Sequence, residues 1–328
     1  MNKFSENKHN PSFYIEGVLA GNIPVLSRAI TIIESTNPQH HKLAGEIIDG
    51  IISHTGHSFR LGITGVPGVG KSTFIESFGK ELLKHGHKVA VLAIDPSSNK
   101  SKGSILGDKT RMEFLSTQAN VFIRPSPSAG SLGGVTKATY ESILLCEAAG
   151  FDFIVVETVG VGQSEIAVSK MTDFFLLLML AGAGDELQGI KRGIMEMADS
   201  ILITKADGDN IQKAKIARAE YAHALHLFPP SESGWIPKVE ICSSTEHTGI
   251  EGIYKLLQSY QLHVKTKGYF SHKRKQQQLD ILKETLNNEI IQAFYEKQNL
   301  KTELDKLEKL ENINPYKEAY RILKENLK

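Results

Sequence analysis

The segment that most constrains the fold of this chain is Gly65–Ser72, whose sequence GVPGVGKS places three glycines before a lysine and a serine. An apolar run at residues 59–64, typical of a buried strand, precedes it, and a stretch with helical spacing follows it. Glycines let the backbone wrap closely around an anion, so that N–H groups and the amino end of the helix point at phosphate oxygens. This order of strand, glycine loop and helix therefore predicts a site for the phosphates of a nucleoside triphosphate.

Short apolar runs alternate with longer helical patterns through the middle of the chain. The runs cover residues 59–64, 88–94, 151–156, 174–180, 200–204 and 239–242. Strands that are apolar throughout and separated by helices are typical of a parallel sheet covered on both faces. We therefore predict an α/β fold in which a mostly parallel central sheet is flanked by helices. The strongest run, residues 174–181, is far shorter than the roughly twenty residues of a membrane-spanning helix.

Both ends of the chain read as helical additions to this sheet. Residues 12–35 carry apolar side chains at intervals of three and four, broken near residues 21–24, and a second helical stretch covers residues 41–53. From Thr266 onward the chain is rich in Lys, Glu, Gln and Leu, and its apolar residues form one helical stripe: Leu279, Leu282, Leu286, Ile290 and Phe294. Residues 273–275, Lys-Arg-Lys, read as solvated charge.

These patterns divide the chain into three parts. We expect an N-terminal helical segment at residues 1–57, a nucleotide-binding domain at residues 58–264 and a C-terminal helical arm at residues 265–328. Because so polar an arm has no core of its own, its apolar stripe packs on the sheet domain or on a second subunit. A helix that packs on its own domain and is otherwise solvated stays open as the simpler alternative.

Composition excludes several classes of function. The 38 basic and 37 acidic side chains leave a formal charge of +1, so we expect no nucleic-acid partner. The short apolar runs predict no membrane partner either. The two cysteines, Cys146 and Cys242, lie far apart and match neither a disulfide framework nor a metal knuckle. The N-terminus has no apolar stretch of signal-peptide length. A cytoplasmic protein is the prediction.

The glycine loop and two acidic residues predict a Mg²⁺ site beside the phosphates. Lys71 bridges the β- and γ-phosphates and Ser72 ligates the metal in loops of this type. Asp95 and Glu157 each close a predicted strand, at the edge where open α/β sheets bind ligands. A turn or helix-capping role is the alternative for each of these two carboxylates. The predicted phosphate-binding residues are Gly65, Val66, Pro67, Gly68, Val69, Gly70, Lys71, Ser72 and Thr73.

A second motif concerns the base. Residues 204–207, Thr-Lys-Ala-Asp, resemble the guanine-reading sequence N-K-x-D, with Thr204 where Asn is commoner. The Asp207 carboxylate can accept hydrogen bonds from guanine N1–H and the exocyclic amine, and adenine lacks this donor pattern. Lys205 would lay its aliphatic stem along the purine face. Ser243 and Ser244 resemble the loop that contacts the guanine carbonyl. A plain strand-to-helix turn is the alternative reading.

Together these segments resemble one family, the MeaB/ArgK-type GTPases of the SIMIBI class of P-loop GTPases, which include the mitochondrial MMAA protein. The resemblance covers most of the chain. It rests on residues 65–73 (GVPGVGKST), 93–98 (AIDPSS), 104–112 (SILGDKTRM), 157–165 (ETVGVGQSE) and 183–199 (AGDELQGIKRGIMEMAD).

The resemblance implies further residues and a partner. Asp108 would join Ser72, Asp95 and Glu157 around Mg²⁺, and residues 182–191 would form an additional switch with Lys191. In the E-x-x-G sequence at residues 157–160, the Gly160 N–H would sense the γ-phosphate. The resulting catalytic set is Lys71, Asp108, Glu157, Gly160 and Lys191.

A GTP-hydrolysing chaperone of an adenosylcobalamin-dependent acyl-CoA mutase of the methylmalonyl-CoA type is the implied function. The GTPase would gate cofactor loading and protect the mutase from inactivation, and the arm would contribute to a homodimer. Because no arginine finger or glutamine can be assigned close to the E-x-x-G sequence, with Gln163 and Lys191 as candidates only, we expect slow intrinsic hydrolysis.

Two other functions stay open. A nickel-insertion GTPase is disfavoured because the histidines lack a Cys–His metal motif. An ATP-dependent kinase of a transport system is disfavoured by Asp207, which does not suit adenine.

Overall fold

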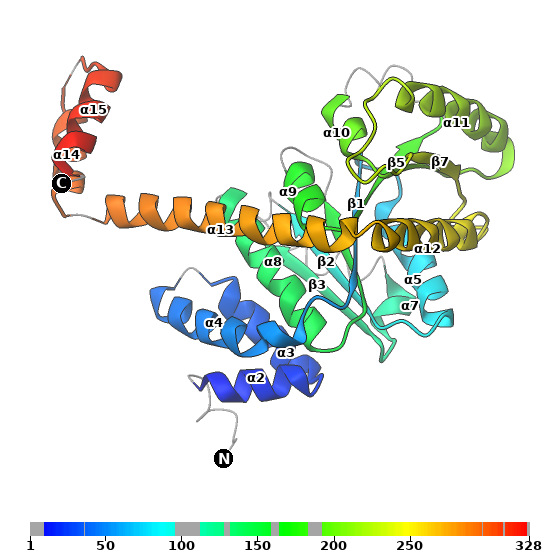
Figure 1. Ribbon diagram of the computed structural model, residues 1–328, viewed down its shortest axis with the longest axis horizontal. Coiled ribbons are helices and arrows are strands. Elements are labelled where there is room, and N and C mark those ends of the chain that lie inside the picture. The colour runs from blue at the N-terminus through cyan, green and yellow to red at the C-terminus, as the bar shows by residue number, and fades with distance from the viewer. Residues whose placement is uncertain are drawn as a thin grey trace. The chain divides into compact units, whose positions relative to one another are not determined.

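The computed structural model describes residues 10–35, 37–95, 112–127, 132–158, 164–182, 192–296, 298–310 and 312–326. The chain divides into two compact units, residues 1–275 and residues 276–328. Figure 1 shows the helices and strands of both units.

A seven-stranded sheet forms the centre of the first unit, with the strand order β3-β2-β4-β1-β5-β6-β7. All neighbouring strands pair in parallel. The strands are β1 (Phe59–Gly65), β2 (Val89–Asp95), β3 (Val121–Pro127), β4 (Phe153–Thr158), β5 (Phe174–Leu180), β6 (Ser200–Thr204) and β7 (Lys238–Ile241). The predicted α/β class with a parallel sheet is confirmed. Strand β3 was missed because Pro125 and Pro127 argue against a strand; prolines are tolerated here because β3 lies at the sheet edge.

Helices cover both faces of the sheet (Figure 1). Alternate residues of β1 point to opposite faces: Leu61 belongs to a core shared with α5 and α12, whereas a Cβ on Gly62 would lie 2.9 Å from the Val168 side chain of α9. Between β1 and residue 268, the described residues form the α-helices α5 (Lys71–Lys84), α7 (Glu113–Ser116), α8 (Leu132–Ala148), α9 (Ser164–Met171), α10 (Arg192–Met197), α11 (Ile211–Leu225) and α12 (Ile250–Thr266). Because both faces are covered, β1, β4 and β5 are buried along almost their whole length, and β5 is apolar throughout.

Among the described residues, three α-helices precede the sheet: α2 (Pro11–Leu19), α3 (Ile23–Ile33) and α4 (Pro38–Ile51). Each begins after an asparagine whose side chain accepts a hydrogen bond from a backbone N–H of the first turn, and each carries a proline at one of its first two positions. The predicted break near residues 21–24 is the turn between α2 and α3, where Gly21 has a φ of 68°. These helices lie against one another and against α8.

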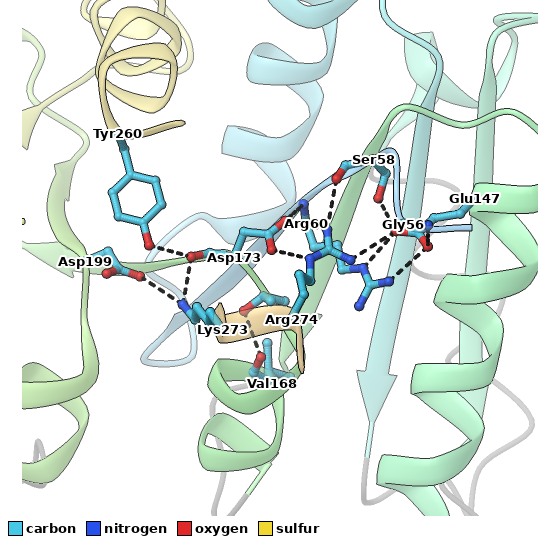
Figure 2. A network of polar contacts seen from close by, with 11 residues as sticks. Gly56, Ser58, Arg60, Glu147, Val168, Asp173, Asp199, Tyr260, Lys273 and Arg274 are labelled. Atoms are coloured by element: carbon cyan, nitrogen blue, oxygen red, sulfur yellow. Dashed lines mark hydrogen bonds and ion pairs between the residues drawn. The ribbon is translucent and has the colours of Figure 1, made fainter. Parts of the chain in front are cut away.

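A buried ionic network lies at the amino ends of the strands (Figure 2). Two guanidinium groups alternate with two carboxylates. Arg60 of β1 donates to both Glu147 oxygens at 2.9 Å, and Arg274 donates to both Asp173 oxygens at 2.6 and 2.7 Å. Arg274 also donates to Glu147 Oε1 at 3.3 Å, which joins the two pairs.

Helix α13 (Tyr269–Tyr295) begins at this network. Lys273 donates to the Asp173 carbonyl at 2.7 Å, one residue before Arg274. The prediction that residues 273–275 are solvated charge is therefore wrong for Lys273 and Arg274. The prediction failed because two carboxylates that are distant in sequence, Asp173 and Glu147, are buried at the same place and need positively charged partners.

The second unit consists of the remainder of α13 together with α14 (Gln298–Leu307) and α15 (Pro315–Asn326). Leu300 of α14 and Ile322 of α15 are buried. Several large apolar side chains of this unit are exposed, among them Leu282, Leu286, Ile290, Ile291 and Tyr295. Within the described parts of the chain, no helix is long and apolar enough to cross a membrane.

Candidate nucleotide site

The glycine loop joins β1 to α5 at the carboxyl end of the sheet. Gly65 and Gly70 adopt positive φ angles of 151° and 96°, which side chains disfavour. A Cβ on Gly65 would lie 2.5 Å from the Leu178 carbonyl oxygen of β5. The loop therefore requires glycine for its backbone conformation and for its close approach to the neighbouring strand.

Lys71 is the first residue of α5 and is buried beneath the loop. Its Nζ donates to the Gly65 carbonyl at 2.8 Å and to the Val66 carbonyl at 3.3 Å. Burial lowers the pKa of this ammonium, while the charges of Glu157 and Glu165 act to raise it. Anionic phosphate oxygens would form stronger, charge-assisted hydrogen bonds with this ammonium than the carbonyls do. The loop and its lysine thus fit a phosphate group.

The strand order brings two predicted acidic positions to the same edge. Strand β4 lies between β2 and β1, and Glu157 is in register with Ile63 of β1 and Ala93 of β2. Glu157 is buried, and the next residue, Thr158, donates its hydroxyl to Thr64 Oγ1 at 2.8 Å. Asp95 is the last residue of β2, and its side chain lies outside the described set.

No group of three or more His, Cys, Asp or Glu side chains within the described residues could hold a metal ion. Mg²⁺ bound at phosphates takes oxygen ligands, among them hydroxyl and carboxylate groups of the protein. Ser72, which is half-buried beside Lys71, and Glu157 fit such a role. Three other predicted residues, Asp108, Gly160 and Lys191, lie outside the described residues.

The end of β6 meets the glycine loop from the other side. Thr204 Oγ1 donates to the Val69 carbonyl at 2.7 Å, and Lys205 Nζ donates to the Gly68 carbonyl at 2.9 Å. Thr204 therefore links this segment to the loop although it replaces the commoner Asn. Lys205 has a φ of 55°, which is uncommon for a residue with a side chain. Asn210, which sequence reasoning missed, donates to the Lys205 carbonyl at 2.6 Å and holds this turn.

Asp207 is fixed by hydroxyl groups of the loop after β7. Ser243 Oγ donates to Asp207 Oδ2 at 2.6 Å, and Thr245 Oγ1 donates to the same oxygen at 3.2 Å. Backbone bonds of 3.0 Å in both directions between Ser243 and Thr248 close the loop. Ser244, the other residue predicted here, is half-buried. Thr245 was missed because a threonine in a polar loop carries no distinguishing sequence signal.

This loop is also tied to helix α5, which begins at Lys71. His247 Nδ1 and the Ser77 hydroxyl of α5 lie 2.8 Å apart, and His247 has a φ of 54°. The glycine loop, the Thr204–Asp207 segment and the loop after β7 are therefore joined by direct hydrogen bonds. The arrangement can hold phosphates at one end and present the Asp207 carboxylate to a base at the other.

Comparison with known proteins agrees with this arrangement. The family described as "Methylmalonyl Co-A mutase-associated GTPase MeaB" matches residues 26–299. GTPase ArgK of Escherichia coli (strain K12) is 46% identical over 275 residues, which cover 84% of this chain and 83% of that protein. The mitochondrial methylmalonic aciduria type A homolog of Mus musculus is 43% identical over 303 residues, which cover 89% of this chain and 73% of that one.

A solved structure gives the same result for the fold. The crystal structure of a LAO/AO transport system kinase superposes with a TM-score of 0.76 at 34% identity, covering 99% of this chain and 98% of that one. The resemblance predicted from the motifs is thereby confirmed. This chain belongs to the MeaB family of methylmalonyl-CoA mutase-associated GTPases, and it is a GTPase.

Proposed function

We propose that this GTPase is a Mg²⁺-dependent switch that binds an adenosylcobalamin-dependent acyl-CoA mutase of the methylmalonyl-CoA type. In this role it gates cofactor loading and protects the mutase from inactivation. The observation that carries the proposal is the family match over residues 26–299, which includes every segment of the candidate site. Slow hydrolysis suits such a switch, since the bound γ-phosphate orders loops that a partner then reads.

The phosphate end is proposed to use residues 65–73, with Lys71 on the β- and γ-phosphates. Ser72, Asp95, Asp108 and Glu157 would hold Mg²⁺, which supplies positive charge that stabilises the phosphoryl oxygens. The Gly160 N–H and Lys191 are proposed to contact the nucleotide from the switch segments. The Lys71 ammonium and the backbone N–H groups of the loop then stabilise the charge that develops as water attacks in line.

Recognition of the base is proposed to rest on Asp207. Its Oδ2 already accepts from Ser243 and Thr245, which holds the carboxylate in one orientation. Its Oδ1 can then accept from the N–H groups of guanine, and adenine would leave this carboxylate without donors. Lys205, held against the loop at Gly68, would cover the purine face, and Ser244 would lie near the base carbonyl.

We also propose that the chain has three parts, residues 1–57, 58–264 and 265–328. The third part, the arm, would form a homodimer. The exposed apolar side chains of α13 support it, because Ile290 and Tyr295 are each 61% exposed and lie in the same stretch of helix. A cytoplasmic location is supported by the two cysteines, both of which are free and buried.

One observation favours a second candidate. The solved structure of 34% identity is that of a LAO/AO transport system kinase, so an ATP-dependent kinase of a transport system is the second candidate. The nickel-insertion alternative has no such support from the described residues, which contain no group of His, Cys, Asp and Glu that could hold a metal ion.

The proposed partner is tested by size-exclusion chromatography of the purified GTPase mixed with a purified methylmalonyl-CoA mutase. A complex whose stability differs between GDP and a non-hydrolysable GTP analogue is expected. Failure to form a complex with any nucleotide, together with preferential hydrolysis of ATP, would favour the kinase instead.

A further inference from the structure

Glu165 is a buried carboxylate that the mechanism above does not use. It lies in the first turn of α9, which follows the segment that begins with the E-x-x-G sequence. Its side chain is 3% exposed, and its Oε2 has no hydrogen-bond partner among the described residues. Burying a carboxylate oxygen without a donor is unfavourable, so a group of this kind in a folded protein calls for an explanation.

The location of Glu165 explains why its oxygen lacks a partner. Its charge acts on the Lys71 ammonium together with that of Glu157, so the carboxylate lies within electrostatic range of the phosphate loop. Helix α9 packs against β1 and β4, the two strands whose ends carry the loop and Glu157. Glu165 is therefore buried at the nucleotide site and not at a distant part of the core.

An ionised carboxylate only accepts hydrogen bonds, so its free oxygen fits a proton donor that arrives with the nucleotide. The Lys71 ammonium carries three protons, of which two go to the Gly65 and Val66 carbonyls, and phosphates would compete for the third. Water is the remaining donor that every GTP hydrolysis must bring to the site. An attacking water has two protons and needs an acceptor that orients its lone pair toward phosphorus.

We propose that Glu165 is a further catalytic residue, whose Oε2 accepts a hydrogen bond from the attacking water and orients it toward the γ-phosphate. The inference rests on the GTPase function proposed above. The water oxygen forms the new bond to the γ-phosphorus, the bond to the β–γ bridging oxygen breaks, and GDP leaves. The proton of the water passes to the released phosphate, so Glu165 ends the cycle unchanged.

The test uses Glu165→Gln, which keeps the shape and removes the charge, and Glu165→Asp, which keeps the charge but shortens the reach. Glu220→Gln on the exposed side of α11 is the matched control. We expect Glu165→Gln to lower kcat about 100-fold, Glu165→Asp to lower it less, and the control to leave it unchanged. The Kd values for GDP and a non-hydrolysable GTP analogue, measured by fluorescence, should stay within about twofold of wild type.

A thermal melt gives a second readout. Because Glu165→Gln removes a buried charge, its Tm should equal or exceed that of wild type, whereas loss of a merely structural group would lower it. An unchanged kcat, or a Kd that rises in proportion to the loss of kcat, would overturn the proposal. The wild-type rate and mutase binding are measured in the same series, so failure of the switch function is distinguishable from failure of this residue assignment.

Discussion

Asp207 is the single residue on which the choice of base depends. Asp207→Asn would replace an acceptor by an amide, so guanine loses its partner while xanthine, which carries a carbonyl in place of the amine, gains a donor. A hydrogen bond to a charged group is worth about 1.5–3 kcal/mol, so GDP affinity should fall about 10- to 100-fold and xanthosine diphosphate affinity should rise. Fluorescent nucleotide titration measures both. Asp209→Asn, on an exposed neighbour, is the control, and equal effects of the two changes would contradict the assignment.

Glu141 of α8 makes the stability of the protein depend on pH. Burial raises the pKa of Glu141 to about 7, from an ordinary value of 4.5. The native state therefore keeps a proton that the unfolded chain releases, and the free energy of unfolding should fall as pH rises from 4.5 to 7. A shift of this size corresponds to at most about 3 kcal/mol. Denaturant melts at pH 5 and pH 8 should show a smaller difference for Glu141→Gln than for wild type.

The pKa of Glu147, six residues further along α8, is shifted in the opposite direction. Although burial alone would raise its pKa, the charge of Arg60, with Arg274 and the Ser58 hydroxyl, lowers it to about 2. Its stabilising contribution is complete above pH 4.5 and is lost only as pH falls toward 2. Glu147 therefore contributes no slope between pH 5 and pH 8, and a pH dependence that Glu141→Gln leaves unchanged would contradict the role given to Glu141.

At the scale of elements, the start of α13 is held by Arg274. Removal of this side chain would leave Asp173 without its bidentate partner and weaken the support of Glu147. Breaking a buried ion pair on one side costs about 3–5 kcal/mol, so Arg274→Ala should be strongly destabilised in chemical unfolding. The adjacent, exposed Lys275→Ala should be nearly neutral, and a similar loss in both variants would refute the buried anchor.

Periodicity predicted the elements well and the contacts between distant segments poorly. The apolar runs located six strands because a strand covered on both faces is built mostly of apolar residues. Strand β3 was missed because its prolines are acceptable only at a sheet edge, and edge position is a property of the fold. Arg274 looked like solvated charge because its partners, Asp173 and Glu147, lie about a hundred residues away.

In the candidate site, too, the sequence predicted some residues and missed others. The loop at residues 65–72 and the Thr204–Asp207 segment were recognisable because backbone shape and base chemistry require those residue types at that spacing. Thr245, Asn210 and Glu165 were not recognisable from the sequence. The role of a single hydroxyl, amide or carboxylate depends on which groups the fold places next to it. Glu165 lies within a quoted motif, yet its burial is visible only in the structure.

At the scale of the whole molecule, the arm should determine the oligomeric state. Light scattering at micromolar concentration is expected to give twice the chain mass of 36.2 kDa for the wild type. Ile290→Glu, which places a charge in the exposed apolar stripe of α13, should shift the mass toward the monomer. Lys283→Glu, on the same helix, is the control for added negative charge, and a wild-type monomer would contradict the proposed dimer.

The central claim is that the nucleotide site serves a mutase partner, and the rate of GTP hydrolysis with and without that partner tests it most directly. A purified methylmalonyl-CoA mutase added in stoichiometric amount should raise the slow intrinsic turnover at least about tenfold, because its contacts order the switch segments around the γ-phosphate. The same mutase should not produce hydrolysis of ATP. An intrinsic rate that no mutase alters would contradict the claim.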